Sequence, residues 1–231
     1  MKYLFYSILI FVFASCNNNS SENQTDEKST HSEQSEILSE SESIKENTPT
    51  NTESQTQKTE KELKTVEDIR EEYQVIMSKI TDGKIIPSSF DYMCNEELEG
   101  KLTYFSENGE LRRIVRQSGY DHGELIREIF LKDNKPFFIF HHMESWSFDV
   151  EANQEHAIRK EITEKRFYIA DNKLIKCLEK EFVNRSAAKN NPVSVNIPNK
   201  DVECSGLSDL MTEYELVLKY KNQTEKMGCL E

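Results

Sequence analysis

The sequence predicts an α+β domain, in which an antiparallel β-meander of about seven strands is flanked by an amino-terminal and a carboxy-terminal helix. Three observations predict this fold. Apolar residues recur every three or four positions over residues 65–80 and again over 206–221. Between these segments, short runs rich in Phe, Tyr, Ile and Val alternate with turn sequences. Three of those turns pair an acidic residue with Asn, which indicates three successive hairpins.

Composition divides the chain into three segments. Residues 1–16 carry 13 apolar side chains, residues 17–62 carry three, and residues 63–231 carry 67 of 169. Only the last segment has enough apolar residues to bury a core, and its length is that of one ordinary domain. We therefore expect a single globular domain over 63–231, which needs no metal or cofactor for its stability.

The first predicted helix, 65–80, has recognisable ends. Thr65 is a suitable N-cap, and Glu67 and Asp68 follow in the first turn, where negative charge interacts well with the helix dipole. Asp82-Gly83 is a typical helix end. The second helix, 206–221, has a stripe through Leu207, Leu210, Tyr214 and Val217, and an irregular stretch with Pro192 and Pro198 leads into it. We expect both helices to lie on one face of a curved sheet.

The predicted hairpins have their turns at Asn108-Gly109, Asp133-Asn134 and Asp171-Asn172. Asn and Gly tolerate the left-handed backbone that two-residue hairpin turns require. A further strand is expected near 89–94. Residues 137–140 are all apolar, which predicts a central strand covered on both faces. The runs 101–104 and 112–116 are more polar and suit solvent-facing or edge positions.

The amino terminus predicts export and a lipid anchor. Lys2 precedes an apolar run, 3–14, which is too short to span a bilayer. The sequence Phe13-Ala14-Ser15-Cys16 resembles the lipobox of bacterial lipoproteins, although Phe13 stands where that family usually has Leu. The resemblance implies a signal peptide over 1–15 and a diacylglycerol-modified Cys16 that binds the lipid bilayer. Its implied location is the cell envelope, at the outer membrane, the periplasmic face or the cell surface. An ordinary secretory signal with a nearby Cys is the alternative.

Residues 16–62 form the predicted linker. Positions 17–62 hold eleven Asp or Glu, four Lys and no aromatic residue, so this segment cannot bury a core and should be disordered. It would act as a stalk, with a docking motif as the alternative. The whole chain has a net charge of −13, which excludes nucleic acid as a natural partner and permits a cationic one.

Four cysteines remain in the domain: Cys94, Cys177, Cys204 and Cys229. An even number in an exported chain is compatible with two disulfides, whose three connectivities the sequence does not separate, or with reduced thiols. Cys204–Cys229 is sterically feasible because the chain could return along the second helix. No two cysteines have CxxC spacing, which excludes redox motifs and zinc ribbons of that kind.

The sequence predicts no catalytic or metal-binding residue. His141 and His142 are neighbours on a strand and point to opposite faces. A metal site that joins one of them to Glu144, Asp149 or His156 is a less favoured alternative. Ser186 and Lys189 have Ser-x-x-Lys spacing, but the partner motifs of penicillin-recognising enzymes are absent. The only expected prosthetic group is the lipid on Cys16.

Tyr120, Trp146 and Phe148 fall in or beside predicted loops, where exposed aromatic residues often anchor ligands. The alternative is that Trp146 folds back onto the core. The sequence therefore predicts a non-enzymatic binding or structural module, displayed on a flexible stalk, for an unknown protein or small ligand. An acidic inhibitor or scavenger of a cationic envelope enzyme or peptide is the second hypothesis, and a hydrolase is the third.

Overall fold

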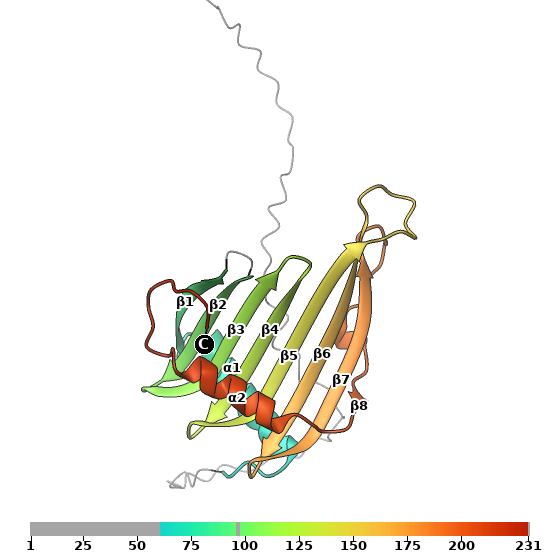
Figure 1. Cartoon of the computed structure of the whole chain (residues 1–231). Coiled ribbons are helices and arrows are strands. Elements are labelled where there is room, and N and C mark those ends of the chain that lie inside the picture. Colours follow the sequence, from blue (N-terminus) through green and yellow to red (C-terminus); the bar gives the residue numbers. More distant parts are fainter. Residues whose placement is uncertain (1–60, 96–97, 231) are drawn as a thin grey trace, which may run out of the picture. The chain divides into compact units, whose positions relative to one another are not determined.

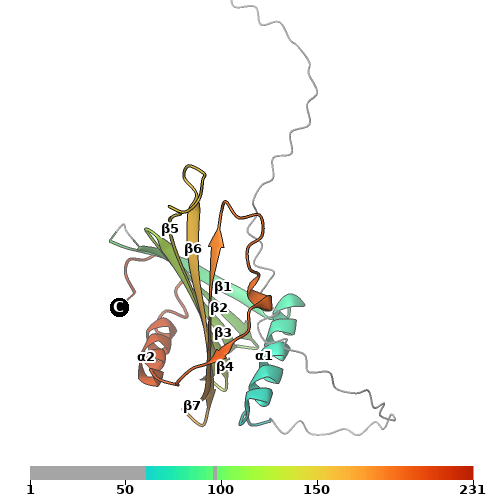
Figure 2. The same ribbon diagram turned by 90° about the vertical axis from the view of Figure 1, so that its right-hand side faces the viewer.

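The protein is described by a computed structural model, which covers residues 61–95 and 98–230. It forms one eight-stranded antiparallel sheet with a helix on each face (Figures 1 and 2). The predicted signal peptide, Cys16 and nearly all of the predicted linker lie outside the described residues. The helices are α1 (Val66–Thr81) and α2 (Leu207–Leu218), and the 3-10 turn η2 spans Ser194–Asn196. The strands are β1 (Ile86–Cys94), β2 (Leu98–Glu107), β3 (Glu110–Tyr120), β4 (Gly123–Lys132), β5 (Lys135–Phe148), β6 (Ile158–Ala170), β7 (Lys173–Arg185) and β8 (Lys200–Asp201).

The strands follow one another in chain order, so the sheet is a meander. The three predicted turns are confirmed, because both central residues of each turn have a positive φ, as a two-residue hairpin turn requires. The prediction of about seven strands misses β8, a two-residue strand beside β7. We call the end with the turns at 108–109, 133–134 and 171–172 the closed end. The end with the connections 121–122 and 149–157 is the open end.

Helix α1 begins and ends where the sequence predicts. The Thr65 hydroxyl accepts a hydrogen bond from the Asp68 amide, and the Asp68 carboxylate accepts one from the Thr65 amide. This capping box satisfies amide groups that the first turn leaves free. The apolar stripe of α1 is buried through Ile69, Tyr73 and Ile76. The helix therefore lies on the sheet by the face that its sequence pattern predicts.

The two helices pack on opposite faces of the sheet, so the expectation that they share a face is wrong. Tyr73 of α1 packs in a cluster with Phe130 and Phe138, whereas Val217 of α2 packs in another with Ile129 and Ile139. Neighbouring residues on a strand point to opposite faces, so these clusters are two separate cores. Figure 2 shows α1 and α2 on either side of the sheet. Both clusters centre on the closed half.

The polar sequence 112–116 also lies differently from expectation. It belongs to β3, which is hydrogen-bonded on both sides and is not an edge strand. Arg113 is buried under the α1 face, where its guanidinium lies 2.6 Å from the carboxylate of buried Glu128 and over the ring of Phe105. Burying a charge is costly unless an opposite charge accompanies it, and the partner here is on the next strand. The expectation that 112–116 faces solvent or forms an edge is therefore wrong, because Arg113 is buried with its partner on the neighbouring strand.

A C-terminal belt, residues 200–230, connects the two edges of the sheet across the α2 face (Figure 1). At the β1 edge, the Met93 amide donates to the Met227 carbonyl at 3.0 Å, and the Met227 amide donates to the Asp91 carbonyl at 3.2 Å. A disulfide between Cys94 and Cys229 fastens this end. Unpaired edge strands invite association with other chains, and here the belt covers part of one.

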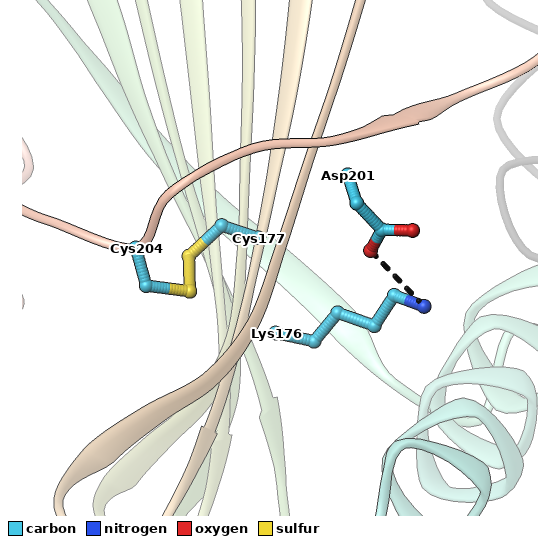
Figure 3. The surroundings of a disulfide bond; sticks show 4 residues. All are labelled: Lys176, Cys177, Asp201 and Cys204. Atoms are coloured by element: carbon cyan, nitrogen blue, oxygen red, sulfur yellow. Dashed lines mark ion pairs between the residues drawn. A yellow bond between two sulfur atoms is a disulfide. The ribbon is translucent and has the colours of Figure 1, made fainter.

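The other end of the belt is held at the β7 edge by bonds on both faces of the sheet. Lys176 and Cys177 are adjacent and point to opposite faces. Cys177 forms a disulfide with Cys204, and the Lys176 ammonium lies 3.3 Å from the Asp201 carboxylate (Figure 3). The belt thus passes around the β7 edge between an ion pair on one face and a disulfide on the other. The four cysteines form two disulfides, and the Cys204–Cys229 alternative is not the pairing that occurs.

Candidate functional site

An aromatic cluster stands at the open end of the sheet. We call it the aromatic end cluster; it comprises His122 of the β3–β4 turn and Trp146 and Phe148 of β5. The Trp146 ring centroid is 4.6 Å from that of His122 and 6.1 Å from that of Phe148. Trp146 belongs to neither core cluster, so the alternative in which it caps the core does not apply. The rings therefore form a surface group.

Local backbone bonding positions these rings. The Trp146 amide donates to the His122 carbonyl at 2.8 Å, which ties the end of β5 to the β3–β4 turn. Beyond Phe148, the connection 149–157 is closed by a bond from the Asp149 amide to the Ala157 carbonyl. Arg185 of β7 binds the buried carboxylate of Asp149. These bonds hold an exposed apolar strip, in which Phe148 is 63% and Val150 is 94% exposed.

Tyr120, the third predicted binding residue, lies at the same end but on the other face. On β3, Tyr120 shares the face of Arg116 and Ser118, which is the α2 face, because alternate residues of a strand point the same way. Its hydroxyl donates a hydrogen bond to the Glu144 carbonyl at 3.2 Å. Trp146 and Phe148 lie on the α1 face, because they are an even number of residues along β5 from Phe138 and Phe140, which face α1. The structure thus brings together two of the three predicted residues and separates the third. His122 is the member that sequence analysis missed, although its place in a two-residue turn beside the end of β5 was a usable signal.

A cleft of about 400 Å3 adjoins this region on β1, β2, β3, β4 and the belt. Glu99, Gly119, Glu124 and Glu144 occupy one cross-strand row on the α1 face. Because Gly119 carries no side chain, the space between Glu99 and Glu124 is left unfilled, and this gap forms part of the cleft. Its charged lining residues are Asp91, Glu99, Glu124, Lys101 and Lys226. The cleft is therefore polar and slightly acidic.

A buried ionic group below the cluster serves the fold. Glu164 on β6 lies 2.9 Å from Arg166 and 3.3 Å from Lys180, and it accepts a hydrogen bond from Ser194 at 2.6 Å. Burial alone would raise the pKa of Glu164, but the nearby His142, the hydrogen bond from Ser194 and the positive charges of Arg166 and Lys180 lower it to about 2. Since Ser194 belongs to the segment between β7 and β8, this group fastens that segment to the α1 face.

The histidines of β5 lie on opposite faces, as predicted. His142 is near Glu164, with its Nδ1 3.8 Å from the carboxylate. His141 packs against Phe167 under the α2 face, where burial and then the charge of Arg127 lower its pKa to about 4. The less favoured hypothesis of a metal site required Glu144, Asp149 or His156 to lie beside His141 or His142. No group of three or more His, Cys, Asp or Glu residues suited to a metal ion occurs in the described part of the chain.

The remaining catalytic candidates are held in structural contacts. Ser186 accepts a hydrogen bond from the Ile158 amide through its hydroxyl, and it lies with Lys189 in the exposed segment after β7 rather than on a helix. The four domain cysteines are all used in disulfides. Within residues 61–95 and 98–230, no helix is long and apolar enough to cross a membrane.

Comparison with known proteins adds no family to this description. No protein-family model, no curated protein and no solved structure matches the chain.

Proposed function

We propose that this protein is a lipid-anchored envelope module without enzymatic activity, which binds a partner through the open end of its sheet. The observation that carries the proposal is the aromatic end cluster with its exposed strip, at the half of the sheet that neither helix covers. Exposed aromatic side chains held by a rigid scaffold are typical anchors of binding surfaces.

The tether and the compartment belong to the same proposal. Two disulfides fasten the belt, and such bonds persist in oxidising compartments, which supports export. Cys16 would carry the lipid, and the acidic residues after it would hold the domain away from the bilayer. A stalk and a binding end fit together, because a tethered module needs reach in order to meet its partner.

A photo-cross-linking amino acid placed at position 148 in cells tests the binding role. We expect one discrete cross-linked species, which disappears when Trp146→Ala is combined with the probe. The same probe at position 175, an exposed site near the closed end of β7, is the matched control and should give none. Absence of an adduct at 148, or equal adducts at both positions, would contradict the proposal.

A further inference from the structure

The chemistry of the open end identifies the class of partner. We infer that this surface binds a cationic polypeptide segment, with Lys or Arg side chains on the aromatic end cluster and the acids beside it. The inference rests on the proposed function, since it names the ligand of the same surface. It follows from a property that aromatic faces and carboxylates share, which is that both attract cations.

The aromatic part of the surface is suited to a guanidinium or an ammonium group. Trp gives the strongest cation–π attraction, and Phe148 extends the aromatic surface beside Trp146 with its ring nearly perpendicular, at 82°. The protein already uses such contacts internally, where Arg166 lies over the Phe140 ring at 5.0 Å. A cation on the exposed ring of Phe148 and the half-buried ring of Trp146 would make the same kind of contact.

Acidic residues surround the cluster. The two connections that flank it, 121–122 and 149–157, contain Asp and Glu but no Lys or Arg. Asp121 and Glu155 have side chains that are 89% and 88% exposed, and the ion pair of each is with the adjacent histidine. Neither carboxylate is therefore neutralised by a Lys or Arg contact in the described residues.

The basic residues nearby are already engaged. Lys160 lies opposite Trp146 on β6, and its ammonium is 2.8 Å from the Glu144 carboxylate. Arg185 is bound by Asp149 and Glu151. Asp121 and Glu155 are therefore the exposed acids of these two connections that an incoming Lys or Arg can pair with.

Length and overall charge favour an extended segment over a small cation. The acidic cleft extends over β1–β4, and β4 neighbours β5, which carries the cluster, so one peptide can reach both. The net charge of −13 would also raise the rate of encounter with a basic chain. A neutral glycan could stack on the rings, but it would gain nothing from the carboxylates' charge.

The only tryptophan of the chain, Trp146, reports on the site directly. We would titrate the full chain, with its disulfides intact, with an Arg-rich peptide that lacks Trp, and follow the Trp146 fluorescence. We expect a saturable change, an apparent Kd that rises with salt, and no change with the matched Glu-rich peptide. A chito-oligosaccharide serves as the neutral probe.

Variants separate the surface from general effects. Phe148→Ala should raise the Kd about tenfold, whereas Tyr120→Ala, an exposed aromatic residue at the same end on the opposite face, should leave it unchanged. Asp121→Asn should weaken binding severalfold, and Asp171→Asn in a closed-end turn should have no effect.

Two outcomes overturn the inference: no response to the Arg-rich peptide, or a response that is independent of salt and equal for the Glu-rich peptide. If the sugar alone binds, or if position 148 still cross-links in cells while the Arg-rich peptide fails, the ligand class is wrong and the proposed function stands. If position 148 gives no adduct either, both fail.

Discussion

The closed and open halves of the sheet use aromatic residues in opposite ways. In the closed half, Phe130 and Phe138 are fully buried beneath Tyr73 of α1, and their rings lie 4.8 and 5.6 Å from it. In the open half, Trp146 and Phe148 continue the same face of β5 but have no helix over them. The difference shows that strand pattern alone does not separate core from binding surface, because the covering element decides which a residue becomes.

The largest expected change in unfolding free energy comes from removing the disulfides that fasten the belt. Removing the Cys94–Cys229 bond by the double change to Ala should cost about 5 kcal/mol of unfolding free energy, and removing Cys177–Cys204 about 3.6, because the sequence separations are 135 and 27. Urea denaturation of the two double variants measures both. A larger loss for the shorter loop would mean that local contacts, and not chain closure, set the effect.

The contrast between the halves is sharpened by matched truncations. Tyr73→Ala should lower the unfolding free energy by about 3–5 kcal/mol, because it opens a cavity among Phe130, Phe138 and the rest of α1. Phe148→Ala should change it by about 0.5 kcal/mol or less. Similar losses from both changes would show that the open end also belongs to the stabilising core.

Acid should destabilise the two faces in different pH ranges. Glu164, on the α1 face, has a folded pKa of about 2 against an ordinary value of 4.5, so its stabilisation is present above pH 4.5 and is lost as the pH falls towards 2. Glu164→Gln should flatten that part of the stability curve. An unchanged slope between pH 4.5 and 2 in this variant would contradict the role given to the carboxylate.

His141, on the α2 face, acts at higher pH. The pKa of His141 is about 4 in the folded chain and about 6.5 in the unfolded chain. As the pH falls from 6.5 towards 4, the unfolded chain takes up a proton that the folded chain does not, so the unfolding free energy decreases. His141→Gln should remove this slope while Glu164→Gln leaves it in place. Thermal unfolding of both variants across the two pH ranges tests this. If both variants lose the same part of the pH dependence of stability, the two residues do not act in separate ranges.

The smallest effect concerns the tether. Cys16→Ala should move the protein from the membrane fraction to the soluble fraction without changing the unfolding free energy of the domain. A variant that stays with the membrane would show that the anchor is not on this residue.

Sequence reasoning predicted the elements well and their arrangement less well. The Asn turns and the Thr65 cap were predictable because they depend on local backbone chemistry. The helix faces were not, since a helix pattern shows which stripe is apolar and not which face of a sheet it covers. The apolar run 137–140, expected to be covered on both faces, already favoured a helix on each side.

The site was only partly predictable for a related reason. Trp146 and Phe148 were identified from their position in or beside a predicted loop, but Tyr120 was grouped with them although strand alternation places it on the other face. The Arg113–Glu128 pair was missed because each residue reads as solvent-exposed until its partner is known. Both errors concern contacts between strands, which single-segment patterns do not contain.

Hydrogen exchange of the full chain, measured with and without a saturating Arg-rich peptide, tests the central claim most directly. On this account the peptide binds at the open end of β3–β6, and the helix-covered cores of the closed half do not contact it. We predict slower exchange of the amides in 120–124 and 144–157 on addition of the peptide, and no change in 128–140 and 166–178. Protection confined to the closed end, or no protection at the open end, would contradict it.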